Sequence, residues 1–113
     1  MINREKFQEN FQYYDNEIIV EVMDIFFFDY AGTLEILEQS IGNLDYATIN
    51  NKAHGLKGVV SYMSPELSEL CYDLEQLGRD KKSEGLHYIF RQLKEGVLEL
   101  VEELKILRQE YAA

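Results

Sequence analysis

The chain has 113 residues, 46% of them apolar and only one of them proline, a length that suffices for one compact domain with its own hydrophobic core. Its 21 acidic residues outnumber 11 basic ones, and the formal net charge of −10 argues against binding to nucleic acids or anionic membranes. The longest apolar run, around Ile25 to Phe28, is far shorter than the roughly 20 residues of a membrane span. We therefore expect residues 1–113 to form a single domain.

The N-terminus and the cysteine content favour the cytoplasm. Residues 1–6 lead directly into charged side chains, without the apolar segment of a signal peptide. Cys71 is the sole cysteine, so it has no partner for an internal disulfide, and its surroundings lack the spacing of a metal site. We expect a cytoplasmic, monomeric protein, and the Met start together with a full set of helices favours a stand-alone one.

Apolar residues recur at helical spacing almost throughout, without the alternation or the Asn-Gly signal of a strand hairpin. A short first helix is expected from Arg4 to Tyr13. Asp15 or Asn16 then caps a second helix, which Gly42-Asn43 ends.

A third helix is expected from about Asp45 to Met63, and Ser64-Pro65-Glu66 provides the start of a fourth. The charged segment from Gly78 to Gly85 is expected to be a loop. The last helix follows, with a long apolar stripe: Leu86, Ile89, Phe90, Leu93, Val97, Leu100, Val101, Leu104 and Leu107. Because short connections make neighbouring helices antiparallel, the pattern predicts an all-α, up-down four-helix bundle with an additional short N-terminal helix.

One histidine is predicted to point out of this bundle. The core positions of the third helix repeat at spacings of four and three: Ile49, Ala53, Leu56, Val60 and Met63. At about 100° per residue, the centre of this seam lies roughly 140° from His54, which therefore faces solvent. Asn50, Lys57, Gly58 and Ser61 fall within about 60° of His54 and share its face.

The residues around His54 suit a phosphoryl group. Gly58 costs about 1 kcal/mol relative to alanine inside a helix, and its position at i+4 leaves open space beside the imidazole. Lys57 at i+3 can place an ammonium next to phosphoryl oxygens. No acidic residue occurs from Tyr46 through Pro65, and imidazole offers a neutral nucleophilic nitrogen near neutral pH.

The run Ala53-His54-Gly55-Leu56-Lys57-Gly58, followed by Leu67, Leu70-Cys71 and Leu74-Glu75, resembles the H-x-L-K-G signature and next helix of histidine-containing phosphotransfer (HPt) domains. The resemblance implies that His54 is the phosphoacceptor and that Lys57 and Gly58 are the assisting lysine and the clearance glycine. Asn50 and Ser61 are further candidates to assist the phosphoryl group or the partner. After Gly58 the chain departs from the family with Val59-Val60 and then Ser64-Pro65, which affects the end of the third helix.

By the same resemblance, the His exchanges its phosphoryl group with an aspartate of a response-regulator receiver domain, in a multistep phosphorelay that also involves a hybrid sensor histidine kinase. Such a carrier has no catalytic activity of its own and needs no cofactor or metal, because the receiver supplies the metal ion. An alternative is a non-phosphorylated helical adaptor that binds a signalling partner through the same face.

Other residues receive simpler interpretations. His87 is expected to be a surface residue without a role, and Cys71 a small buried hydrophobe. A metal or hydrolytic site is disfavoured, because the two histidines lie on different helices and no HExxH motif is present. The side chains of Phe26-Phe27-Phe28 diverge by about 100° per residue. We favour packing of this run under the N-terminal helix over a patch that a receiver covers.

Overall fold

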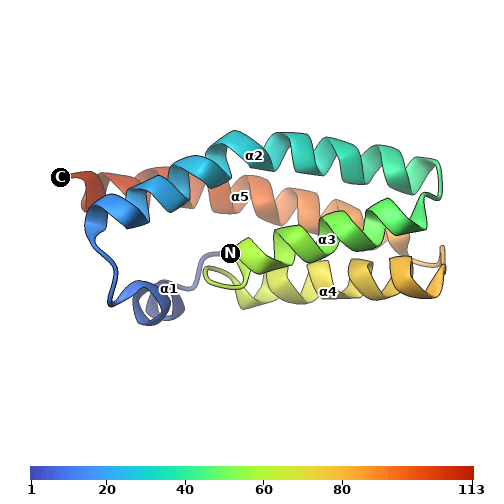
Figure 1. Cartoon of the computed structure of the whole chain (residues 1–113), viewed down its shortest axis with the longest axis horizontal. Coiled ribbons are helices and arrows are strands. Elements are labelled where there is room, and N and C mark those ends of the chain that lie inside the picture. The colour runs from blue at the N-terminus through green and yellow to red at the C-terminus, as the bar shows by residue number, and fades with distance from the viewer.

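The computed structural model describes all 113 residues, and every regular element in it is a helix. The elements are α1 (Arg4–Phe11), α2 (Asn16–Gly42), α3 (Tyr46–Val60), α4 (Pro65–Asp80) and α5 (Leu86–Ala112). Helices α2 to α5 run alternately up and down and form an antiparallel four-helix bundle (Figure 1). The predicted all-α class and the extra N-terminal helix are therefore confirmed.

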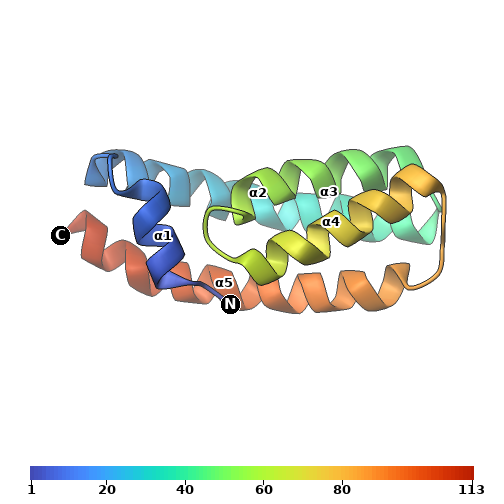
Figure 2. The same ribbon diagram turned by 90° about the horizontal axis from the view of Figure 1, so that it is seen from below.

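The lengths of the helices explain where α1 lies. Helices α2 and α5 have 27 residues each, whereas α3 and α4 have 15 and 16. The long pair extends past the short pair at one end of the bundle, and α1 crosses there (Figure 2). Its buried residues Phe7 and Phe11 contact the rings of Tyr111 and Tyr62, so α1 closes the open end of the core.

The N-terminal caps agree with the sequence. The side chain of Asp45 accepts a hydrogen bond from the Thr48 amide at the start of α3, and Ser64 accepts one from the Leu67 amide at the start of α4. Asp15 occupies the cap position of α2 without a side-chain hydrogen bond. Each capped amide would otherwise lack a partner within its helix.

Two helix ends come earlier than predicted. Helix α1 ends at Phe11 rather than Tyr13, which is almost fully exposed and has no core contact to hold a further turn. Helix α3 ends at Val60 rather than Met63. The reason lies in Ser64, whose extended backbone (φ −146°, ψ 103°) is needed to cap α4. Met63 nevertheless remains buried in the turn between the two helices.

The expected loop from Gly78 to Gly85 is wrong in its first part. Helix α4 continues through Gly78 to Asp80, and Lys81 ends it in the left-handed conformation at φ 54°. Gly78 is buried inside the helix, where a Cβ would lie 2.7 Å from the Asn50 nitrogen and 2.9 Å from the Tyr46 carbonyl oxygen. This glycine therefore permits close packing of α4 against α3 rather than a loop.

The core follows the predicted seams. All five predicted core residues of α3 are buried, as is the stripe of α5 except the half-buried Ile89. Each fully buried aliphatic side chain contributes about 1.5–3 kcal/mol relative to exposure. Cys71 belongs to this core, and burial raises the pKa of its thiol to about 12. It is the small buried hydrophobe that the sequence predicts.

The three consecutive phenylalanines have three different surroundings. Phe26 is buried in the core and Phe27 is half-buried against it. Phe28 is 88% exposed, so packing under the N-terminal helix is wrong for this residue, while the divergence of the three rings follows from the helical spacing. No helix of the chain has the length and apolarity to cross a lipid bilayer.

Candidate functional site

The imidazole of His54 points away from the bundle. Its side chain is 67% exposed, while Ala53 and Leu56 on either side of it in α3 are buried. The core seam of α3 thus leaves His54 on the outer face, as the helical spacing predicts. Of its two ring nitrogens, Nδ1 has a hydrogen-bond partner within the chain and Nε2 has none.

The partner of Nδ1 is Glu75 on the adjacent helix α4. The His54 Nδ1 atom lies 2.7 Å from Glu75 Oε1, and the Lys57 ammonium donates to Glu75 Oε2 at 2.5 Å. The hydrogen bond from Lys57 is the main cause that lowers the pKa of the Glu75 carboxyl; burial opposes this shift and the contact with His54 adds to it. Glu75 is therefore an ionised, acceptor-only group at neutral pH.

This contact selects one tautomer of His54. Because a carboxylate accepts but cannot donate, the proton of the neutral imidazole resides on Nδ1 and donates to Glu75. The lone pair is then on Nε2, the nitrogen without a partner in the chain. The ring is oriented with its nucleophilic atom available to an incoming group.

Lys57 is held close to the imidazole by two contacts. Its ammonium bonds to Glu75 and lies 5.2 Å from the centre of the Tyr72 ring, which provides a cation–π contact. The side chain is only 25% exposed, so these contacts leave it little conformational freedom. A fixed positive charge beside the ring is suited to binding the oxygens of a phosphoryl group.

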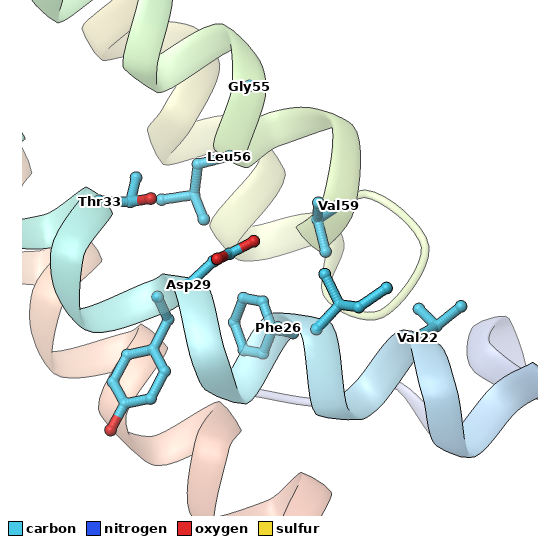
Figure 3. Close-up of a pocket in the computed structure, with 9 residues that line it drawn as sticks. Val22, Phe26, Asp29, Thr33, Gly55, Leu56 and Val59 are labelled. Atoms are coloured by element: carbon cyan, nitrogen blue, oxygen red, sulfur yellow. The ribbon is translucent and has the colours of Figure 1, made fainter.

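A shallow apolar groove between α2 and α3 begins next to His54. It has a volume of about 220 Å³, and Gly55, the neighbour of His54, forms part of its wall. In Figure 3, Leu56 and Val59 of α3 face Phe26 and Asp29 of α2 across this groove. Most lining side chains are apolar: Val22, Ile25, Phe26, Tyr30, Leu56 and Val59.

Comparison with known proteins places this arrangement in a family. The family model described as "Hpt domain" matches residues 21–109, which include all of α3 and α4. The chain belongs to the Hpt domain family. Hpt domains act in phosphotransfer within two-component signalling, together with kinases and receiver domains.

The fold of this Hpt domain is also found in a crystal structure. Histidine-containing phosphotransfer protein B (HptB) from Pseudomonas aeruginosa PAO1 superposes with a TM-score of 0.87 at 20% sequence identity. The match covers 97% of this chain and 96% of that one, so it includes the N-terminal helix as well as the bundle. No curated protein has significant sequence similarity to the chain.

The remaining candidates on the His54 face have different surroundings in this Hpt domain. Apart from the neighbouring backbone of its own helix, nothing lies within 4 Å of a Cβ built on Gly58, so the space there is open as predicted. Asn50 donates to the Glu75 carbonyl oxygen at 2.9 Å and thus joins α3 to α4. Ser61 donates to the Gly58 carbonyl of its own helix. Neither side chain makes a hydrogen bond with His54.

Glu75 is the site residue to which the sequence assigned no role. In the sequence it appears only as part of the helix that follows the signature. The residue that could have pointed to Glu75 is Gly78, because its close approach to Asn50 fixes the level of α4 against α3. Glu75 lies three residues before Gly78 and His54 four residues after Asn50, which in antiparallel helices brings the two side chains together.

The chain offers no evident site for a metal ion. No three side chains of His, Cys, Asp or Glu come close enough together to share one. His87 is exposed near the start of α5, on a different helix from His54.

Proposed function

We propose that His54 is the phosphoacceptor of a multistep phosphorelay and that Nε2 is the atom that carries the phosphoryl group. The supporting observation is the exposed imidazole whose Nδ1 atom bonds to Glu75 beside the ammonium of Lys57. In a chain that belongs to the Hpt domain family, this arrangement provides a nucleophilic nitrogen, a fixed orientation and a nearby positive charge.

The chemistry requires little from the chain itself. The Nε2 lone pair attacks the phosphorus of an aspartyl phosphate, and the electron pair of the broken P–O bond returns to the aspartate carboxylate. Lys57 lies close enough to attract the phosphoryl oxygens, and Gly58 leaves space for the partner's backbone. The partner supplies the aspartate, so the chain acts as a carrier and not as an enzyme by itself.

The proposed partners are a receiver domain and a hybrid sensor histidine kinase. The groove between α2 and α3 supports this proposal, because most of its lining is apolar and its wall includes Gly55, the residue next to the phosphoacceptor. Ile25 is 56% exposed on its wall, and a docked receiver would remove this apolar surface from water. Docking there also brings the receiver's active site to Nε2.

The decisive experiment is phosphotransfer from a receiver labelled with radioactive phosphate. The wild type should acquire an acid-labile phosphate. The substitution His54→Gln should abolish the label, whereas His87→Gln, which removes the other histidine, should retain it. Unchanged labelling of His54→Gln would overturn the assignment. Binding of the receiver without any labelling of the wild type would favour the non-phosphorylated adaptor instead.

A further inference from the structure

The group that contacts His54 Nδ1 is a carboxylate, which restricts the proton on the ring. A glutamine amide in the same place could accept a hydrogen bond through oxygen or donate one through nitrogen, but a carboxylate can only accept. Lys57 helps to keep Glu75 ionised through its hydrogen bond to Oε2. Glu75 therefore stabilises His54 only in states in which Nδ1 carries a proton.

We propose that Glu75 is a positioning residue that retains the Nδ1 proton of His54 before, during and after phosphorylation. The phosphoryl group then always leaves from a cationic phosphoimidazolium ring. This inference rests on the proposed function of His54. It assigns the carboxylate a role in releasing the phosphoryl group, in addition to orienting the unphosphorylated ring.

The bonds and charges balance without any proton transfer. In the forward step, the Nε2 lone pair forms the N–P bond while the P–O bond to the donor aspartate breaks. The ring, with hydrogen on Nδ1 and phosphorus on Nε2, becomes a cation next to the negative charge of Glu75. In the reverse step, an aspartate oxygen attacks phosphorus, and the N–P electron pair returns to Nε2. The ring leaves as neutral imidazole.

The alternative without the Nδ1 proton is unfavourable for release. A phosphorylated ring with a bare Nδ1 must leave as an imidazolate anion or first acquire a proton from water. The anion is a much poorer leaving group than the neutral ring because it is a far stronger base. Its negative charge would in addition form beside Glu75, which is only 13% exposed. Retention of the proton therefore makes both directions of transfer accessible, as a relay intermediate requires.

The test uses the whole chain, labelled with nitrogen-15 at histidine and phosphorylated with phosphoramidate. NMR at about pH 8, above the ordinary imidazole pKa of about 6.5, reports whether Nδ1 is protonated in the phosphorylated ring. We expect a protonated Nδ1 in the wild type and a bare Nδ1 in Glu75→Gln. Phosphohistidine in Glu75→Gln should also hydrolyse about tenfold more slowly, the factor that corresponds to one pKa unit.

Asp73→Asn is the matched control, because it removes one negative charge from an exposed position of α4 that makes no hydrogen bond or ion pair. It should behave like the wild type in both measurements. A bare Nδ1 in the phosphorylated wild type would overturn the role of Glu75 even if Glu75→Gln failed to fold. Equal spectra and hydrolysis rates for wild type and Glu75→Gln would do the same. Absence of phosphate from His54 would instead overturn the proposed function.

Discussion

Gly78 packs so closely against the backbone of Asn50 that a Cβ would not fit between them, and this close approach sets the level at which the helix of His54 meets the helix of Glu75. A Cβ on Gly78 would lie 2.7 Å from the Asn50 nitrogen and 3.1 Å from its Cα, distances at which one helix must move. The hydrogen bond from the Asn50 side chain to the Glu75 carbonyl oxygen reinforces the same register.

Substitution Gly78→Ala should therefore destabilise the fold. Overpacking of this kind costs about 1–3 kcal/mol, and the atoms that the methyl group would meet belong to the backbone, which cannot rotate away. Urea unfolding followed by circular dichroism measures the change. A variant as stable as the wild type would show that α3 and α4 can move apart to admit the methyl group without a loss of unfolding free energy.

Gly58→Ala should have the opposite effect on stability. Apart from the neighbouring backbone of its own helix, a Cβ at this position meets nothing within 4 Å, and alanine is favoured over glycine inside a helix by up to about 1 kcal/mol. The methyl group would nevertheless occupy the space beside His54. We expect a more stable protein that receives a phosphoryl group from a receiver more slowly, measured as the rate of labelling. A rate equal to that of the wild type would contradict the clearance role.

Gly58 and Gly78 show which features can be predicted from the sequence. Local spacing was sufficient to predict the core seam of α3 and the outward direction of His54, because both depend on one helix alone. The same reasoning predicts a loop at Gly78, because a glycine is as typical of the end of a helix as of a close contact between two helices. The role of Glu75 depends on the register between α3 and α4, which no periodicity within either helix determines.

Lys57→Gln should slow phosphorylation of His54 by between about tenfold and a hundredfold, since the ammonium that attracts phosphoryl oxygens is lost. Lys52→Gln is the matched control, as it removes the same charge from α3 at a position with no ion pair. Initial rates of transfer from a labelled receiver provide the measurement. Equal slowing by both substitutions would indicate a general effect of charge instead of a local one.

The ionisation of Glu75 makes the stability of the fold depend on pH. The pKa of this carboxyl is lower in the folded chain than its ordinary value of 4.5, so its contribution is complete above pH 4.5 and is lost as the pH falls through the folded pKa. The difference in unfolding free energy between wild type and Glu75→Gln should thus shrink on acidification. Urea unfolding at a series of pH values tests this, and a difference independent of pH would contradict it.

The groove beside His54 can be tested separately from the chemistry of the imidazole. Ile25→Glu places a charge on the wall of the groove, where a docked receiver would have to desolvate it. We expect the rate of transfer from a receiver to fall about tenfold or more, while phosphorylation by the small donor phosphoramidate is unchanged. Ile106→Glu is the control, because Ile106 is similarly exposed (62% against 56%) on α5, outside the groove. Equal rates of transfer to both variants would show that the receiver docks elsewhere, because a charge inside the docking surface should slow transfer to Ile25→Glu and leave transfer to Ile106→Glu unchanged.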